Sequence, residues 1–259
     1  MLVDSHCHLD YFTQPGEQAE VIARAQAEGV GEMVTIGVTL AQSRDIIAIV
    51  ERFESVWACV GVHPNHAADV MPVVAPDVLA SLAQHPKVIG IGESGLDYFY
   101  DKAPKDIQVQ NFRANIRAAR LAELPVCIHA RDADDDIIRI LREEREDGYF
   151  DFLLHCFSSS RPLAEAAIEL GGYVSFSGIL TFPKGEAVRE VAAIIPEDKL
   201  LVETDSPYLA PAPYRGKRNE PAYTAYTARR LAELRNLDES ELAAITTRNF
   251  RTLFKKAAT

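Results

Sequence analysis

The segments LVDSHCH at residues 2–8 and LLVETDS at residues 200–206 decide the fold, because each is a short apolar run that ends in metal-binding side chains. Such runs predict buried strands, and α/β sheets carry their active sites at the carboxyl ends of the strands. In a flat sheet of eight strands ordered by sequence, the first and last strand ends would lie about 33 Å apart, at about 4.8 Å per strand. Closing the sheet makes these strands neighbours. The two segments therefore favour a closed barrel over an open, doubly wound sheet.

Six further apolar runs lie between these segments, and helix-like stretches separate them. The expected strands begin near Leu2, Glu32, Val56, Val88, Pro125, Phe152, Gly172 and Leu200. In the stretches between them apolar residues recur at three- and four-residue intervals, as in amphipathic helices. Near-continuous apolar strands alternating with helices indicate a parallel sheet covered by helices. We expect a single (β/α)₈ TIM barrel over residues 1–259, with extra C-terminal helices from about Glu220.

The composition of the chain is that of an ordinary globular protein, with 47% hydrophobic and 25% charged residues among 259. Its net charge of −11 excludes binding of duplex DNA through a general basic surface. The charge does not exclude an enzyme that meets only a strand end. No apolar run of about 18 residues is present, so we expect no contact with a membrane. No obligate protein partner is evident.

The cysteines predict a reducing environment. Cys7, Cys59, Cys127 and Cys156 show no CxxC spacing and follow no signal-peptide pattern, which favours reduced thiols and a cytoplasmic location. Alternation along the strands predicts that Cys7 and Cys156 point away from the site. Cys127 shares the parity of His129.

Side chains that bind metals stand at the carboxyl ends of most expected strands. They are His6, His8, Glu93, His129, His155 and Asp205. His6 and His8 share one face of the first strand, because side chains alternate. In a closed barrel Asp205 comes from the neighbouring strand, so these three residues predict one metal half-site.

The remaining candidates predict a second half-site. His129 and His155 end two adjacent strands, and Glu93 ends the strand beside them, where its two oxygens could bridge both ions. Two metals about 3.5–4 Å apart with a water between them hydrolyse phosphate or amide bonds. As unrelated structural groups, the six residues would leave several unpaired charges in a barrel mouth, at a cost of several kcal/mol.

Three further residues share the parity of the ligand candidates. Asp4 and Glu203 are expected one layer deeper, to orient ligand histidine rings, and the alternative is a plain buried salt bridge. His63, in the segment GVHP, is expected to point into the mouth. There it would hydrogen-bond a phosphate or the leaving group, and the alternative is a hydrogen bond to a neighbouring loop.

Charged and aromatic residues after the strands are the substrate candidates. The cations expected to contact phosphate are Arg131, Arg215, Lys217 and Arg218, the alternative being ordinary solvated charges. Asp97 and Tyr98 are expected to shape the rim. Tyr208 and Tyr214 are expected to stack on a base, worth about 1–3 kcal/mol each, unless they serve in packing.

Seven segments of the chain resemble, in order, the TatD family of metal-dependent hydrolases, which belongs to the amidohydrolase-like barrels. They are DSHCHLD, GVHP, GESGLDY, PVCIHARDA, LLHCFS, GGYVSFSG and LLVETDSPYLAP. The resemblance runs from Leu2 to about Phe254, and one departure is Ser94, where many members carry Ile or Thr. It implies a TIM barrel, divalent metals, a cytoplasmic location and deoxyribonuclease activity from 3′ ends. It also implies that the six ligand candidates bind the metals.

The sequence therefore predicts hydrolysis of a phosphodiester at the 3′ end of DNA or RNA. Two divalent ions are expected, with Mg or Mn favoured by the chemistry and Zn as the other option. Asp205 is expected to take the proton of water, with Glu93 and His63 as the other catalytic residues. One alternative is an amidohydrolase-like hydrolase of C–N or carboxyl ester bonds, such as a deaminase, lactonase or aminoacyl-tRNA deacylase. A binding protein without catalysis is the other.

Overall fold

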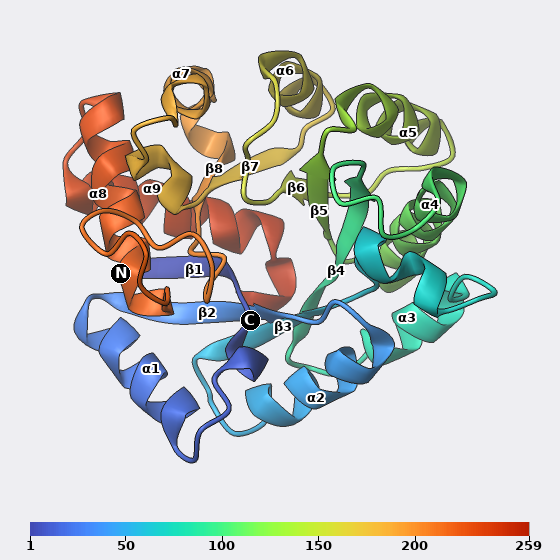
Figure 1. Ribbon diagram of the computed structural model, residues 1–259, viewed down its shortest axis with the longest axis horizontal. Coiled ribbons are helices and arrows are strands. Elements are labelled where there is room, and N and C mark those ends of the chain that lie inside the picture. Colours follow the sequence, from blue (N-terminus) through green and yellow to red (C-terminus); the bar gives the residue numbers. More distant parts are fainter. Residues whose placement is uncertain (259) are drawn as a thin grey trace.

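The computed structural model describes residues 1–258 and contains eight parallel strands in a ring surrounded by helices (Figure 1). The strands are β1 (Leu2–Cys7), β2 (Val30–Ile36), β3 (Val56–Val60), β4 (Val88–Asp97), β5 (Val126–Arg131), β6 (Phe152–Leu154), β7 (Tyr173–Phe176) and β8 (Leu200–Val202). Each pairs in parallel with the next, so all eight expected strands are present in chain order. Thr259, the last residue of the predicted domain, lies outside the described residues.

The barrel closes between β1 and the segment that follows β8. The backbone N–H of His8 donates to the carbonyl of Ser206 at 2.8 Å, and that of Asp205 donates to the carbonyl of His6 at 2.9 Å. Cys7 and Ser206 also form a parallel bridge. The predicted (β/α)₈ TIM barrel, with its first and last strands as neighbours, is confirmed.

Amphipathic helices cover the outside of the barrel. They are α1 (Glu17–Ala27), α2 (Leu40–Val50), α3 (Pro76–Leu82), α4 (Lys105–Ala122), α5 (Asp134–Glu146), α6 (Arg161–Glu169), α7 (Glu186–Ile194), α8 (Thr224–Arg235) and α9 (Glu239–Leu253). Helix α4, for example, buries Phe112, Ile116 and Ala119 at three- and four-residue spacing. Within residues 1–258, no helix has both the length and the apolar character needed to cross a membrane.

An apolar layer fills the barrel near the amino ends of its strands. The strands contribute Val3, Val34, Ile36, Cys59, Ile89, Cys127, Leu153, Tyr173 and Leu201. Phe250 and Leu253 of α9, and Phe254 directly after it, belong to the same cluster. The C-terminal helix therefore closes the end of the barrel opposite the carboxyl ends of the strands, and the polar residues stand on a packed floor.

Asp4 joins β1 to the segment after β8 instead of supporting a histidine ring. Its Oδ1 accepts hydrogen bonds from the backbone N–H of Thr204 at 2.9 Å and of His6 at 3.3 Å, and its Oδ2 accepts one from the Thr204 hydroxyl at 2.6 Å. The expectation that Asp4 orients a ligand ring is wrong, because the register of β1 shifts between Asp4 and Cys7 and interrupts the simple alternation. Burial, only partly opposed by these bonds, raises the pKa of Asp4 to about 8.

We predict that Asp4→Ala lowers the free energy of unfolding by about 1–3 kcal/mol for each group of Thr204 left unpaired. Asp4→Asn should cost less, because a protonated carboxyl and an amide both offer a donor and an acceptor. The raised pKa means that proton uptake stabilises the folded wild type at low pH, and that this contribution is lost as the pH rises from the ordinary 3.8 through about 8. Asp4→Asn should lack this pH dependence. Urea unfolding of chelator-treated proteins across this range measures the difference, and parallel pH profiles would contradict the assignment.

Candidate metal centre

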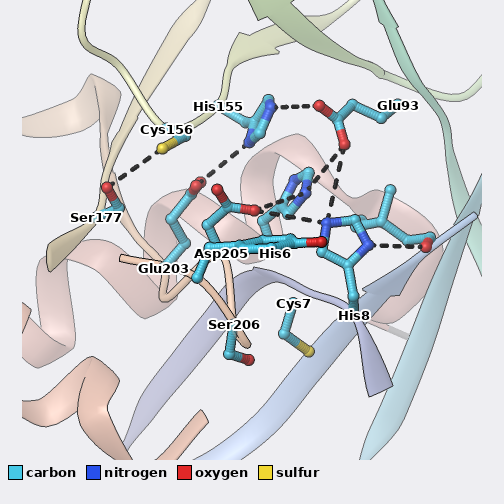
Figure 2. Close-up of polar contacts among 12 residues, drawn as sticks. His6, Cys7, His8, Glu93, His155, Cys156, Ser177, Glu203, Asp205 and Ser206 are labelled. Carbon is cyan, nitrogen blue, oxygen red and sulfur yellow. Dashed lines mark hydrogen bonds and ion pairs between the residues drawn. The ribbon is translucent and has the colours of Figure 1, made fainter. Parts of the chain in front are cut away.

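The carboxylate of Glu93 lies at the centre of a cluster of histidine rings and divides it into two halves. In Figure 2, one of its oxygens points to His155 and the other toward the histidines of β1. Oε2 lies 3.4 Å from His6 Nε2 and 4.0 Å from His8 Nε2. Oε1 lies 2.8 Å from His155 Nε2 and 3.0 Å from His129 Nδ1. Two oxygens that face two sets of nitrogens are suited to bridging two cations.

Asp205 completes the half of the cluster on β1. Its Oδ1 lies 3.5 Å from His8 Nε2 and 3.8 Å from His6 Nε2. The residue follows β8 in the left-handed region, with φ of 56°, and its side chain is 16% exposed. Burial acts to raise the pKa of Asp205, but the hydrogen bond from His8 and the charges of nearby rings hold it below its ordinary value. The carboxylate is therefore ionised and reaches the solvent side of the cluster.

Glycines beside Glu93 let β4 and β5 approach closely. Gly95 has φ of 140°, and a Cβ there would lie 2.0 Å from the carbonyl oxygen of His129. Gly92 has φ of 136°, and a Cβ there would lie 2.6 Å from the carbonyl oxygen of Cys127. Any side chain at either position would separate the strands that carry Glu93 and His129.

Two carboxylates hold the far nitrogens of two rings. Glu203 Oε1 lies 3.3 Å from His155 Nδ1 (Figure 2), the type of contact predicted for a carboxylate that orients a ligand ring. Asp97 Oδ2 lies 3.0 Å from His129 Nε2. Each ring therefore turns its other nitrogen toward Glu93.

Asp97, which the sequence analysis placed at the rim, contacts the ring of a candidate metal ligand. The structure buries it completely, and its Oδ1 also accepts the backbone N–H groups of Phe99 and Tyr100. The difference arises because β4 continues to Asp97, so that Glu93 and Asp97 share one face of the strand. If the alternation of side chains along the strand had been continued four residues beyond Glu93, it would have placed Asp97 on the same face.

The rings of His6 on β1 and of His8 directly after it are held by uncharged groups. His8 Nδ1 lies 3.3 Å from the carbonyl oxygen of Ile36, and His6 Nδ1 lies 3.3 Å from Cys127 Sγ. His6 Nε2 is fully buried and makes no hydrogen bond, although it points between the carboxylates of Glu93 and Asp205. Buried nitrogens without a partner are rare, and a cation in this position would satisfy it.

The donor set fits divalent cations. The ligand atoms of His6, His8 and Glu93 lie within 4.8 Å of one another. The structure also brings Asp205 to this half, and His129 and His155 to the other oxygen of Glu93. All six predicted ligands thus meet at one cluster. His6, His8, Asp205 and Glu93 would hold one ion, and His129 and His155 would hold a second together with the other oxygen of Glu93.

His63 lies beside the second half of the cluster. Its Nε2 is 3.2 Å from Glu93 Oε1, and its Nδ1 accepts the backbone N–H of Asn65 at 3.0 Å. Burial lowers the pKa of His63 to about 4, so the ring is neutral at pH 7. A neutral ring that accepts at Nδ1 carries its hydrogen on Nε2. His63 is therefore a hydrogen-bond donor at the cluster.

A cavity of about 440 Å³ lies above the cluster. Its wall includes Arg131 and Tyr208, which the sequence predicted as substrate contacts. Tyr11, Tyr100 and Lys102 also line it, and the sequence analysis missed them. Tyr11 ends a short 3-10 helix after β1, and Tyr100 and Lys102 stand in the loop after β4, where no periodic pattern marks a direction.

The other three predicted phosphate contacts do not line this cavity in the described part of the chain. Arg218 donates to Glu17 Oε1 at 2.7 Å and to the carbonyl of Tyr11 at 2.5 Å. The guanidinium of Arg215 lies 3.6 Å from the ring centre of Phe182. The ammonium of Lys217 lies 5.6 Å from a tyrosine ring, that of Tyr214. The long loop after β8 thus turns Arg215, Lys217 and Arg218 to neighbours outside the cavity, and their contact with phosphate stays a prediction.

Two more expectations are corrected by local geometry. Tyr214 stacks on Tyr223, with ring centres 4.1 Å apart and planes at 3°, so it serves in packing. Cys156 lines the cavity instead of pointing away, because β6 ends at Leu154 and Cys156 itself has φ of 44°. Its Sγ lies 3.3 Å from Ser177 Oγ (Figure 2). All four cysteines are free thiols, as expected.

Comparison with known proteins finds the same family along the chain. The model of the family described as TatD related DNase matches residues 3–255. An uncharacterized metal-dependent hydrolase of Bacillus subtilis, YabD, is 40% identical over 257 residues, which cover 98% of this chain and 99% of that protein. The 3′-5′ ssDNA/RNA exonuclease TatD of Salmonella typhimurium is 34% identical over 244 residues, covering 92% of this chain and 93% of that protein. The crystal structure of YjjV, a TatD homologue of Escherichia coli, superposes with a TM-score of 0.88 at 28% identity, over 98% of both chains.

We predict that Asp97→Asn lowers the affinity for divalent metal by about 10–100-fold, because His129 loses the charged acceptor that orients its ring. The matched control is Asp136→Asn on α5, whose carboxylate accepts the hydroxyl of Tyr98 and contacts none of the clustered histidines. Calorimetric titration with Mn²⁺ measures both variants, and thermal unfolding checks that they are folded. Equal affinity of Asp97→Asn and the control would remove Asp97 from the metal centre.

Proposed function

The chain belongs to the family of TatD-related DNases, and on that premise we propose that it is a divalent-metal-dependent hydrolase that removes nucleotides from the 3′ end of DNA or RNA. The observation that carries the proposal is the position of Glu93, whose two oxygens face two separate sets of imidazole nitrogens. Paired cations suit phosphodiester hydrolysis, which concentrates negative charge on the phosphoryl oxygens. The activity named for the Salmonella relative supports the choice of a 3′ end.

Bound divalent cations would lower the pKa of a water and offset charge on the phosphoryl oxygens. The ionised carboxylate of Asp205, at the solvent side of the cluster, accepts the proton of the attacking water. The water oxygen bonds to phosphorus as the bond from phosphorus to the 3′ oxygen breaks. His63 donates its Nε2 hydrogen bond to the leaving 3′ oxygen, which then takes a proton from solvent. Arg131 at the cavity wall neutralises a phosphate oxygen.

Several wider properties belong to the same proposal. Mg or Mn is the favoured metal, with Zn as the other option for an imidazole-rich site. We infer one domain, no membrane contact and no obligate protein partner. The four free thiols support a cytoplasmic location.

Asp205→Asn should reduce kcat on 3′-labelled single-stranded DNA by about 10²–10⁴-fold, because the amide cannot accept the proton of water. The KM should change little, since the substrate contacts remain. Asp69→Asn provides the control, because Asp69 is exposed and pairs with His66 at 2.8 Å. Wild-type activity in Asp205→Asn would remove this residue from the mechanism.

Metal removal tests the proposed function directly. Protein stripped with a chelator should be inactive, and Mg²⁺ or Mn²⁺ should restore hydrolysis of 3′-labelled single-stranded DNA or RNA. Each restored form is also assayed on a panel of amides and carboxyl esters. Recovery on that panel alone would indicate an amidohydrolase-like enzyme. Inactivity with every metal and every substrate would indicate a binding protein.

A further inference from the structure

Exposed aromatic side chains gather at the mouth of the cavity above Glu93. Among residues 1–258, the aromatic side chains exposed by more than a third are Tyr11 (39%), Phe99 (55%), Tyr100 (53%), Tyr149 (68%) and Tyr208 (50%). Tyr11, Tyr100 and Tyr208 line the cavity, and the ring of Phe99 lies 5.0 Å from that of Tyr100. Packing does not account for large apolar rings left in water, so four of these five side chains point to a ligand of the cavity.

The four rings form two pairs on opposite sides of the metal centre. Tyr11 and Tyr208 have ring centres 6.0 Å apart and lie 5.8 and 6.4 Å from the ring of His8. Phe99 and Tyr100 follow β4, which stands across the barrel from β1 and β8 (Figure 1). A ligand that contacts both pairs therefore passes over Glu93.

A cation accompanies the second pair. The guanidinium of Arg131 lies 4.3 Å from the ring centre of Phe99 and 5.2 Å from that of Tyr100. Within the described part of the chain Arg131 has no carboxylate partner, and it lines the cavity. Lys102 Nζ lies 5.8 Å from the ring of Tyr100. Aromatic faces next to free cations are the surfaces on which unpaired bases stack while phosphates are neutralised.

The surroundings limit how far a strand extends on this side. A second hollow, of about 940 Å³, begins at Phe99 and Arg131, but its wall also carries Asp134, Asp135 and Asp136. Carboxylates repel phosphates, so an anionic strand does not follow this hollow. The aromatic pair serves the nucleotide next to the scissile phosphate and little beyond it.

The two sides also differ in chemistry. Asp205, the proton acceptor for water, lies 3.5 Å from His8 on the side of Tyr11 and Tyr208. His63, the donor for the leaving oxygen, has its ring 4.6 Å from that of His129 on β5, the strand that ends in Arg131. In-line displacement places the water and the leaving oxygen on opposite sides of phosphorus. The leaving 3′ oxygen, and the nucleotide that carries it, therefore face Phe99 and Arg131.

We propose that Phe99, Tyr100 and Arg131 form a stacking platform for the nucleotide that precedes the scissile phosphate, while Tyr11 and Tyr208 receive the terminal nucleotide. The inference rests on the proposed function and deepens it. A base that stacks on an aromatic face has left its Watson–Crick partner, so the platform selects a single-stranded end over a blunt duplex.

The test compares Phe99→Leu/Tyr100→Leu with the matched control Tyr149→Leu. Tyr149 is also an exposed ring beside a guanidinium, with Arg145 at 4.2 Å, and it precedes β6 at the opposite end of the barrel. The substrates are a single-stranded oligothymidylate, its blunt duplex with oligoadenylate, and a dinucleotide of two abasic deoxyriboses, a small phosphate ester that has no aromatic ring to stack. The double substitution should raise the KM for the single strand by about 5–150-fold. The ratio of kcat/KM for the single strand to kcat/KM for the duplex should therefore fall. Hydrolysis of the small ester should stay at the wild-type rate, and the control should match wild type throughout.

A binding measurement separates the platform from the proposed activity. Fluorescence anisotropy reports the affinity of a labelled oligothymidylate for metal-loaded Asp205→Asn protein, with and without the two leucine substitutions. If wild type hydrolyses no phosphodiester with any metal, the proposed function fails, and the anisotropy result still decides on the platform. The platform would be overturned if the affinity were the same with and without the leucine substitutions, or if neither protein bound the strand. It would also be overturned if the KM values of wild type and the double variant were equal, or if the double variant lost as much activity on the small ester as on the single strand.

Discussion

The closure of the barrel between β1 and the segment after β8 is the constraint on which the site depends. Two backbone hydrogen bonds, from Asp205 to His6 and from His8 to Ser206, fix the last ligand against the first two. Asp4 reinforces the same seam by binding both backbone and hydroxyl of Thr204. Because the packed floor supplied by α9 fills the barrel below, these side chains have no space into which to relax. The cluster is therefore held in place by the fold around it.

The cluster is expensive to hold together. Burial acts against the charge on Glu93, yet the charge of His155 and the hydrogen bonds of His129 and His155 hold the pKa of Glu93 well below its ordinary value. Its carboxylate is ionised and requires positive charge nearby, which protons on the rings or divalent cations supply. Metal binding at imidazoles displaces such protons, so the apparent metal affinity depends on pH. The buried cluster thus lowers the stability of the empty barrel, and bound cations would raise that stability again.

The parts of the fold and site that the sequence predicted are those set by strand order and strand period. All six ligand candidates could be found because each stands in the carboxyl-terminal part of a strand or shortly after it, and a closed barrel brings these parts together. Asp97 was missed because β4 runs four residues beyond Glu93, a boundary that apolar composition does not mark. Asp4 was misplaced by a register shift in β1, and Cys156 by a left-handed residue after β6. Both interruptions are features of local backbone geometry, which the alternation of side chains along a strand does not predict.

The loops follow a different rule. Arg215 was expected at the cavity from its position after β8, but its guanidinium lies 3.6 Å from the ring of Phe182, while Arg131 remains at the cavity beside Phe99. Nothing in the spacing of charges along a loop separates these outcomes, because each depends on which neighbour a flexible side chain meets. The strand ends, fixed by topology, hold the candidate metal ligands, whereas the loops hold the candidate substrate contacts. Proteins with this barrel can therefore share one arrangement of strand ends and differ in their loops, and in this chain the loops place four exposed aromatic rings around the cavity above Glu93.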